Sequence, residues 1–286
     1  MATIIDGKAI AEKIRADLAA QVKELQSRGI TPGLATVLVG SDPASEVYVR
    51  MKGDACNKLG MHSVKITRPA ETTEEELLAL INELATQFYE AWFPGSWAQP
   101  YLAERLRQDI TGHAGIRPGY ARDGWTTLVD HLHRQGVTGD EMLTAGVATT
   151  ARDGRLIDRF RDRLVLPIVH EGQVLGFVGR RNPEHADDGK HGPKYLNTAD
   201  TPLFHKGDQL YVVGDPTARR AVLVEGPIDA IAVRLATGGS RFGAAPLGTS
   251  LTQPQARQLA ELDPRPVIAT DADAAGHAAA ERDYWL

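Results

Sequence analysis

Three acidic side chains near the C-terminal end of the sequence have the arrangement expected of a divalent-metal site. Glu225 follows the apolar run 221–224, and Asp271 and Asp273 follow a second apolar run at 266–270. If both runs are parallel strands, their carboxyl ends meet at one edge of a sheet, where the three carboxylates converge. Clustered carboxylates repel one another unless a cation neutralises them, and hard oxygen ligands favour Mg²⁺ or Mn²⁺. The alternative is that Asp271 and Asp273 only cap a helix.

A metal ion at this position would suit phosphoryl transfer. Asp229 lies one helical turn beyond Glu225. A divalent ion held by the three carboxylates can activate a hydroxyl nucleophile and shield a triphosphate during in-line displacement. Glu225, Asp271 and Asp273 are therefore candidate catalytic residues and candidate metal ligands.

Basic side chains that could hold phosphate groups precede these carboxylates along the chain. Arg159, Arg161 and Arg163 alternate, so they could form a row on one face of a strand. They are followed within about forty residues by Arg180, Arg181, Lys190, Lys194 and Lys206. Such a set can hold phosphates without reading bases. The alternative is a solvated, arginine-rich surface.

The elements that position the basic residues are predicted to be β-rich. Apolar runs at 164–169 and 174–181 flank Glu171-Gly172, which is the pattern of a hairpin. The region ahead of them, 88–150, contains glycine-punctuated loops and two stretches of helical periodicity. The larger part of the chain therefore reads as helices, then a β-rich region, then a parallel sheet.

Helices and strands alternate in the first 87 residues, which predicts a parallel α/β sheet. The expected elements are a helix after Asp6, a strand at 33–40, a helix from Pro43, a strand at 63–67 and a helix from Glu74 to about Ala85.

Tyr48 and Lys52 share one face of the second of these helices because they lie four residues apart. A buried lysine beside a tyrosine hydroxyl can act as an acid or base. The alternative is a solvated surface pair.

Amino-acid usage changes between Gln87 and Phe88, a position that we call the junction. Residues 1–87 hold six Lys and four Arg, whereas the remainder holds three Lys and nineteen Arg. Tyr48 is the only aromatic residue before the junction, and all four Trp and all six Phe follow it. A single co-evolved domain rarely changes in this way, so the junction predicts two segments of different origin.

Length and composition set limits on the whole chain. The 286 residues suffice for one or two domains, and 42% hydrophobic residues can build a core. The net charge of −5 does not indicate nucleic-acid binding, although a local basic face under an acidic total is common. The single cysteine, Cys56, excludes an internal disulfide and a cysteine-rich zinc site, and no apolar run of membrane-spanning length occurs. We expect a cytoplasmic protein without membrane association.

The segment before the junction closely resembles the start of the bifunctional methylenetetrahydrofolate dehydrogenase/cyclohydrolase family. The resemblance covers residues 1–87 and is carried by Ile4-Ile5-Asp6-Gly7-Lys8-Ala9-Ile10-Ala11, Val37-Leu38-Val39-Gly40-Ser41-Asp42-Pro43-Ala44-Ser45, Tyr48-Val49, Lys52, Ala55-Cys56 and Leu59-Gly60. It implies that Tyr48 and Lys52 line a folate pocket, with Lys52 as the key catalytic group. The family oxidises methylenetetrahydrofolate with NADP and hydrolyses the methenyl product.

Other parts of that family's machinery do not occur in this sequence. No Val-Gln-Leu-Pro-Leu-Pro segment follows, and no glycine-rich dinucleotide fingerprint opens a helix after a strand. We therefore expect no NADP site and neither dehydrogenase nor cyclohydrolase activity.

The segment after the junction resembles the catalytic core of a DnaG-type bacterial primase. The motifs occur in the family's order: Asp158-Arg159-Phe160-Arg161-Asp162-Arg163, Gly179-Arg180, Pro193-Lys194-Tyr195-Leu196-Asn197, Thr201-Pro202-Leu203-Phe204-His205-Lys206-Gly207, Leu210-Tyr211, Val224-Glu225-Gly226, Asp229, Leu247-Gly248-Thr249, and Asp271, Asp273 and Gly276. The resemblance implies a TOPRIM fold for about 218–286. It implies metal ions among Glu225, Asp229, Asp271 and Asp273, and nucleic acid or nucleotide near the Arg159, Arg161, Lys194 and Lys206 side chains.

Several parts of the primase family are expected to be missing. The sequence has no N-terminal zinc domain, and we expect no zinc site. The later acidic pair of the family and its helicase-contacting region are also expected to be absent. Metal binding could survive these losses more readily than efficient primer synthesis.

The predicted fold class is α/β: an incomplete α/β folate-domain fragment, an α+β primase-core region and a TOPRIM-like parallel-sheet domain. The predicted domains are a partial folate-binding segment at 1–87, a primase core at 88–217 and a truncated TOPRIM domain at 218–286. The junction itself, near 85–100, is expected to be poorly ordered, because the first segment lacks sheet partners for its apolar faces.

The leading functional interpretation is a DNA primase core fragment, making RNA primers from ribonucleotides on single-stranded DNA with Mg²⁺ or Mn²⁺, fused to a one-carbon-enzyme fragment. One alternative is a metal- and nucleic-acid-binding module without turnover. Another is a one-carbon enzyme whose C-terminal part has been replaced, retaining weak folate binding through Tyr48 and Lys52. A further alternative is a fusion with no selected function.

Overall fold

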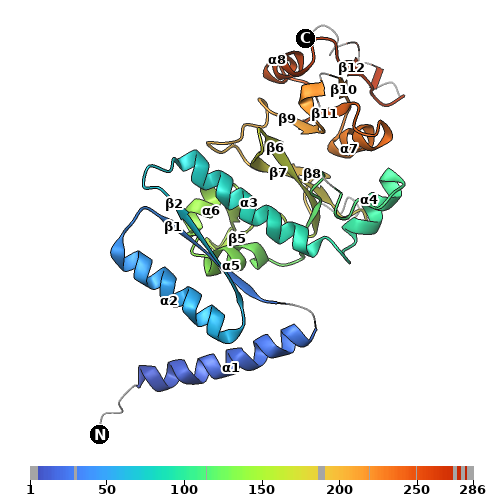
Figure 1. The fold of residues 1–286 in the computed structure, drawn as a ribbon. Coiled ribbons are helices and arrows are strands. Elements are labelled where there is room, and N and C mark those ends of the chain that lie inside the picture. Colours follow the sequence, from blue (N-terminus) through green and yellow to red (C-terminus); the bar gives the residue numbers. More distant parts are fainter. Residues whose placement is uncertain are drawn as a thin grey trace. The chain divides into compact units, whose positions relative to one another are not determined.

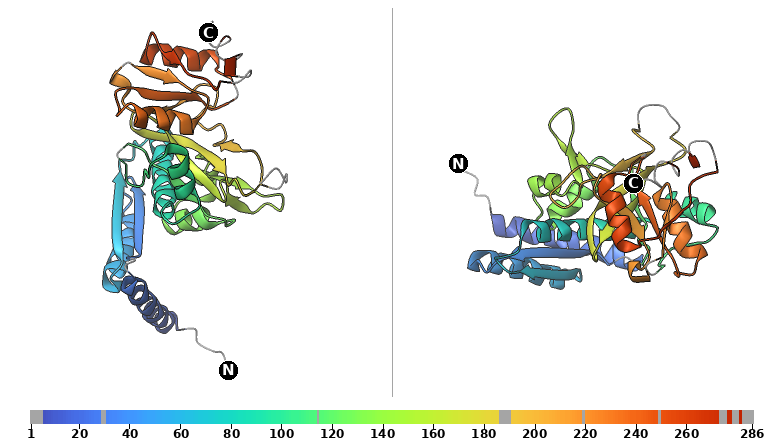
Figure 2. Two further views of the ribbon diagram at one scale, coloured as in Figure 1. Left: turned by 90° about the vertical axis from the view of Figure 1, so that its right-hand side faces the viewer. Right: turned by 90° about the horizontal axis from the view of Figure 1, so that it is seen from above.

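The chain forms two compact units, which are described separately. The computed structural model describes residues 6–28, 31–113, 115–185, 191–218, 220–248, 250–272, 276–277 and 281. The first unit comprises Met1–Thr73 with His133–Val137, and the second comprises Glu74–Leu132 with Thr138–Leu286. Figure 1 labels the elements, and Figure 2 gives two further views of the same ribbon.

The first unit contains two helices and a two-stranded parallel sheet. Its elements are α1 (Gly7–Ser27), β1 (Gly33–Val39), α2 (Pro43–Leu59) and β2 (His62–Arg68). The strands pair in parallel from Gly33 opposite His62 to Val39 opposite Arg68. The Asp42 side chain accepts a hydrogen bond from the Ser45 backbone N–H and so caps the start of α2.

Apolar side chains of the first unit are only partly buried. Val22, Leu38, Cys56 and Val137 are its buried apolar residues among those described. Along α1, in contrast, Ile10, Ile14 and Leu18 recur every fourth residue and are 40–53% exposed. Two strands are few for an independently stable sheet, which agrees with this shallow core.

The helix that contains the junction belongs to the second unit. Helix α3 (Glu74–Trp92) runs without interruption through Gln87 and Phe88. The prediction that this helix ends near Ala85 in a poorly ordered junction is therefore wrong. The reason is packing: one face of α3 is buried on both sides of the junction, at Leu78, Ile81, Leu84, Ala85 and Tyr89.

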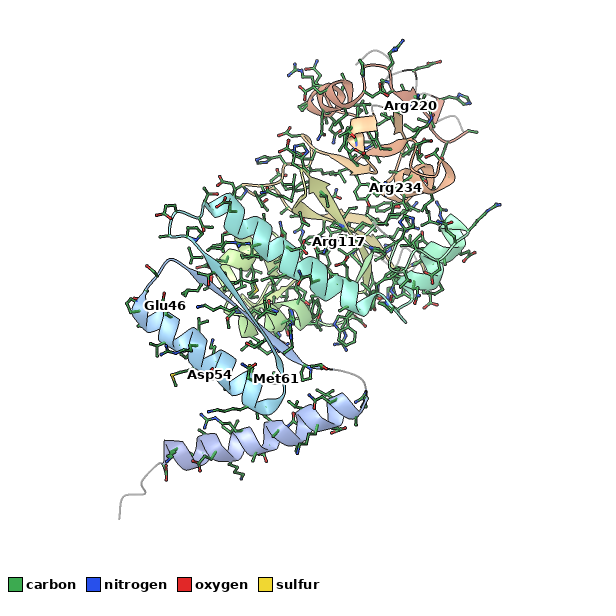
Figure 3. All side chains as sticks on the ribbon, viewed as in Figure 1. Glu46, Asp54, Met61, Arg117, Arg220 and Arg234 are labelled. Atoms are coloured by element: carbon green, nitrogen blue, oxygen red, sulfur yellow. The ribbon has the colours of Figure 1, made fainter. Side chains whose placement is uncertain are left out.

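Side chains of α3 also form polar contacts within the second unit. The buried Asn82 amide donates to the Val174 and Leu175 carbonyl oxygens, each at 3.1 Å. The Arg117 guanidinium binds the Glu83 and Glu90 carboxylates at N–O distances of 2.8–2.9 Å, one on each side of the junction (Figure 3). Helix α3 is thus fixed to the β-rich part of the unit by apolar, amide and ionic contacts.

An antiparallel sheet forms the first half of the second unit. Its order is β3 (Gly119–Ala121), β6 (Arg163–His170), β7 (Gln173–Arg181) and β8 (Tyr195–Asn197). The β6–β7 hairpin confirms the prediction from sequence, and Glu171 and Gly172 form its turn with φ angles of 48° and 80°. The surrounding elements are α4 (Ala98–Leu106), α5 (Thr127–Arg134), α6 (Gly139–Thr144), β4 (Ala148–Thr150) and β5 (Leu156–Asp158).

A mixed sheet forms the second half of this unit. Its order is β12 (Val267–Ile268), β10 (Ala221–Leu223), β11 (Phe242–Pro246) and β9 (Leu210–Val213). The first three strands are parallel and β9 is antiparallel, so the predicted parallel pairing of the two acidic-ended strands is confirmed. Helices α7 (Pro227–Ala236) and α8 (Gln253–Leu262) and the short 3₁₀ helix Pro216–Ala218 complete it.

None of the helices described in this structure combines the length and apolar character that crossing a bilayer requires.

Candidate metal and nucleotide site

A cleft of about 370 Å³ in the second unit gathers several residues predicted from the sequence. Lys194, Lys206 and Glu225 all line it. The remaining wall is formed by Val178, Pro193, Tyr195, Asn197, Gly226, Pro227, Pro246, Leu247 and Gly248. The cleft therefore has two ammonium groups and one carboxylate, which is a suitable charge pattern for a metal-bound phosphate ligand.

Acidic residues lie at one edge of the mixed sheet. Glu225 follows β10 and Asp271 follows β12, and these strands are neighbours. The Asp271 backbone N–H donates to the Glu225 carboxylate at 2.9 Å, and both side chains are exposed. The parallel pairing thus brings together two of the carboxylates that the sequence predicted at this edge.

Asp229 lies near these two carboxylates, in the first turn of α7. Burial raises the pKa of Asp229 above its ordinary value, and the negative charges of Asp271 and Glu225 act in the same direction. Arg105 opposes this shift; its Nη2 is 3.9 Å from the Asp229 Oδ1. Because the carboxylates are close enough to repel, a bound cation would stabilise them.

The fourth acidic residue, Asp273, lies outside the described residues. Among the residues that are described, no three His, Cys, Asp or Glu side chains already form a group that could hold a metal ion. Position 276 requires glycine, because a Cβ there would collide with the Asp271 carbonyl group. Only glycine therefore allows the chain to pass this close to Asp271.

The three predicted phosphate-binding arginines do not form a row, because only Arg163 lies on a strand. Arg159 donates to the Asn197 carbonyl oxygen at 2.9 and 2.6 Å and so lies against the cleft wall. Arg161 donates to the Asp158 carbonyl oxygen and covers the Trp125 ring, with its guanidinium carbon 4.6 Å from the ring centre.

The Arg163 side chain is buried and binds backbone carbonyl groups. It is 4% exposed and donates to the carbonyl oxygens of Gly179, His191 and Pro193. Burial lowers the pKa of Arg163 to about 10, and the charge of Arg181 adds to this effect. Its nitrogen atoms hold the chain just before Lys194, so Arg163 positions a cleft residue and is not free to bind phosphate.

Asp162 is a second positioning residue, and the sequence did not reveal its role. Its carboxylate accepts hydrogen bonds from the Trp97 indole, the Tyr120 hydroxyl and the Asn182 amide, and it contacts the His185 ring at 2.6 Å. Its φ of 45° is unusual for a residue other than glycine. Asp162 and Arg163 together fix both ends of the segment between β7 and β8.

Arg180, another member of the predicted phosphate-binding set, lies between two aromatic rings. Its guanidinium carbon lies 5.4 Å from the centre of the Tyr101 ring and 5.1 Å from that of Tyr195. Burial raises the pKa of the Tyr195 hydroxyl above its ordinary value. The Gly179-Arg180 motif was visible in the sequence, but its aromatic partners come from distant segments.

The folate-type pair lies in the first unit, on the surface of α2. The Lys52 ammonium nitrogen is 4.4 Å from the centre of the Tyr48 ring, and Tyr48 is 61% exposed. The two residues share a helix face as predicted, with the Tyr48 ring exposed and Lys52 half-buried.

Three families match successive parts of the chain. Residues 5–88 match the tetrahydrofolate dehydrogenase/cyclohydrolase catalytic domain, 92–215 match the N-terminal domain of the DNA primase catalytic core, and 222–284 match a Toprim-like family. The bifunctional protein FolD 2 of Geobacter metallireducens is 73% identical over 84 residues, which are 29% of this chain and 30% of that protein.

Primases account for the larger part of the chain. The DNA primase of Deinococcus radiodurans is 35% identical over 233 residues, covering 78% of this chain and 39% of that protein. The RNA polymerase domain of Mycobacterium tuberculosis primase DnaG has a TM-score of 0.62 at 30% identity, covering 73% of this chain and 71% of that one. Another similar structure is a DnaG primase catalytic domain bound to single-stranded DNA. The chain spans about a third of the length of the curated relatives it matches.

The two kinds of similarity overlap before the junction. Primase relatives cover 73% and 78% of the chain, which is more than the residues after Gln87 can supply. The similarity to primases therefore begins before the junction, whereas the folate-family match continues to residue 88. This overlap agrees with the packing of α3 in the second unit.

Proposed function

We propose that this chain, whose larger part belongs to the DnaG-type primase family, catalyses metal-dependent, template-directed ribonucleotide transfer. A tetrahydrofolate dehydrogenase/cyclohydrolase segment precedes that part. The observation that carries this proposal is the cleft that combines Lys194, Lys206 and Glu225, next to Asp271. Its substrates are ribonucleoside triphosphates, and its template is single-stranded DNA.

The residues that would hold Mg²⁺ or Mn²⁺ are Glu225, Asp229, Asp271 and Asp273. The donor set suits such an ion because carboxylate oxygens are hard ligands. Burial raises the pKa of Asp229, and so do the negative charges of Asp271 and Glu225, a repulsion that a bound cation would offset. When bound, the ion supplies charge neutralisation for phosphoryl transfer.

Side chains of the cleft have separate tasks in this proposal. Lys194 and Lys206 bind the nucleotide phosphates, since each ends in an ammonium group on the cleft wall. Arg159 supports the Asn197 backbone on the same wall, and we assign Arg161 to template binding. Asp162 and Arg163 hold the segment that presents Lys194.

We assign these tasks to regions of the chain. Residues 88–217 contain the basic side chains for the template and the incoming nucleotide, and 218–286 contain the metal ligands. The helix before residue 88 packs within the same unit, so the functional primase unit includes α3 from Glu74.

The test is primer synthesis by the full chain on single-stranded DNA, with labelled ribonucleotides and added Mg²⁺ or Mn²⁺. Incorporation is expected for the unmodified chain, with a loss of at least about 100-fold in Asp271→Ala. Lack of incorporation with either metal would overturn the proposal and favour a binding module without turnover. Glu261→Ala is a suitable control, because this exposed carboxylate of α8 does not line the cleft.

We further propose that the first unit retains weak folate binding through Tyr48 and Lys52, as the match to the folate family suggests. Titration with tetrahydrofolate, with Lys52→Ala as the variant, tests this second proposal. Equal affinities of the two proteins would refute it.

A further inference from the structure

We propose that a cavity between the two sheets of the second unit binds an uncharged, largely apolar small molecule that carries a hydrogen-bond acceptor such as a carbonyl oxygen. The cavity has a volume of about 570 Å³. None of the described residues that line it also lines the metal and nucleotide cleft. This second site does not depend on the proposed primase function.

The walls of the cavity are mainly aliphatic and come from both sheets. Pro167 and Val169 belong to β6 of the antiparallel sheet, and Val213 belongs to β9 of the mixed sheet. The two strands contact each other (Figure 1). Ile116 and Leu262 of α8 complete the apolar wall. A concave, mostly apolar space of about 300–1,000 Å³ is typical of a small-molecule site.

The Tyr211 hydroxyl is the polar group in this wall that is available to a ligand. Tyr211 is 4% exposed and lines the cavity. Its hydroxyl has no hydrogen-bond partner among the residues that the structure describes. Burial raises the pKa of Tyr211 above its ordinary value, so the hydroxyl stays protonated and can donate. Because a buried polar group without a partner is costly, a ligand that brings an acceptor would offset this cost.

Other polar side chains of the wall already have partners. The Arg117 guanidinium binds two carboxylates, which leaves it no free charge for an anionic ligand. The Gln258 side chain accepts a hydrogen bond from the Leu210 N–H. The Thr217 hydroxyl donates to the Asp215 carboxylate. The hydrogen bond that the wall offers is therefore the single one from the tyrosine.

Charged residues that line the cavity at the β6–β7 turn are open to solvent. The His170 and Glu171 side chains are 48% and 86% exposed, and the His170 Nε2 lies 4.0 Å from a Glu171 carboxylate oxygen. Water therefore solvates these groups whether or not the cavity is occupied. A charged ligand would lose its hydration in the aliphatic interior without gaining a partner there, and so the site favours an uncharged one.

The cavity and the cleft lie at opposite ends of β9. Leu210 begins this strand and pairs with Pro246, which lines the cleft. Val213 ends the strand and lines the cavity. A ligand in the cavity would thus contact both sheets without entering the cleft, so it should not compete with a nucleotide.

The experiment titrates the full chain with prodan, an uncharged naphthalene ketone whose emission moves to shorter wavelength in apolar surroundings. The comparison ligand is dimethylaminonaphthalene, which lacks the ketone. The unmodified chain should bind prodan with shortened emission wavelength and should prefer it to the comparison ligand. Tyr211→Phe should weaken prodan binding by about 2- to 12-fold and abolish this preference, since it removes one hydrogen bond. Its urea midpoint should not fall, because the hydroxyl has no partner in the described structure to lose.

A second variant tests the place of binding. Val169 is 37% exposed, and Val169→Trp should fill the cavity and weaken prodan binding by at least about tenfold. Val267→Trp is the matched control, because Val267 is a 46% exposed strand valine of the same unit that does not line the cavity. It should bind prodan as the unmodified chain does.

Three results would overturn the inference: no shift of prodan emission with the unmodified chain, equal binding by Val169→Trp and Val267→Trp, or an unchanged ligand preference in Tyr211→Phe. If Val169→Trp does not fold, the Tyr211→Phe comparison decides alone. Primer synthesis is not measured here, so its failure and the failure of this site are distinguishable.

Discussion

Replacement of Arg117 by methionine tests how strongly α3 is bound to the second unit. Arg117 binds Glu83 through two N–O contacts of 2.8 Å and Glu90 through contacts of 2.9 and 2.8 Å. Methionine fills a similar volume but leaves both carboxylates without their cation. Because Glu83 lies before the junction and Glu90 after it, the substitution weakens the attachment of α3 to the second unit on both sides of the junction.

The size of the effect follows from the exposure of the three side chains. They are 32–35% exposed, so each pair is intermediate between a surface pair and a buried one. Surface pairs contribute about 0.2–1 kcal/mol, and breaking a buried pair costs about 3–5 kcal/mol. We therefore expect Arg117→Met to lower the free energy of unfolding of the second unit by about 2 kcal/mol.

The effect should also depend on pH. Hydrogen bonds from Arg117 hold the pKa of Glu83 below its ordinary value, against the opposing effect of burial. This stabilisation is fully present above the unfolded pKa of about 4.3 and is lost as the pH falls through the lower folded pKa. The difference between Arg117→Met and the unmodified chain should therefore shrink below about pH 4.

Tryptophan fluorescence during urea unfolding is a suitable assay, because all four Trp lie after the junction and report on the second unit. Arg155→Met is the control, since Arg155 and its partner Asp153 are 70% and 54% exposed and their loss should not move the midpoint. The reasoning is refuted if Arg117→Met changes the stability by less than about 0.5 kcal/mol, or equally at pH 7 and pH 3.

Two further predictions concern buried polar contacts of the second unit. Asn82→Ala should destabilise this unit by about 1–3 kcal/mol in the same urea assay, because it leaves the Val174 and Leu175 carbonyl oxygens without the amide donor; a neutral result would contradict this. Arg163→Met should make the segment before Lys194 more sensitive to limited proteolysis and raise the KM for ribonucleotides more than it lowers kcat; an unchanged cleavage pattern would count against the positioning role.

Local sequence patterns predicted the strands, turns and acidic edge of the second unit well. The β6–β7 hairpin has continuous apolar runs on both sides of a Glu-Gly turn, and β10 and β12 are short apolar strands that acidic residues soon follow in the sequence. These features depend on neighbours in the chain. Once these two strands pair, Glu225 and Asp271 lie close together, so their proximity can be predicted from the strands alone.

Features that depend on distant packing could not be predicted in the same way. Alternation of Arg159, Arg161 and Arg163 is equally compatible with a phosphate-binding row and with arginines that hold backbone carbonyl groups. The choice between them depends on Asn197, Gly179 and Pro193, which come from other segments. Similarly, the change in amino-acid composition indicated a change of origin at Gln87. The second unit nevertheless begins at Glu74, because residues of α3 before Gln87, such as Asn82, contact β7.

Helix α3 shows what allows segments from two families to meet within one folded element. The core contacts one face of this helix, and Ile81 and Ala85 before the junction lie on the same face as Tyr89 after it. Any exchange of sequence at this point must therefore preserve the angular phase of the helix. One inserted residue would rotate everything beyond it by about 100° and turn Tyr89 away from the core, whereas many different residues are acceptable on the outer face. The junction is thus constrained in register far more than in sequence.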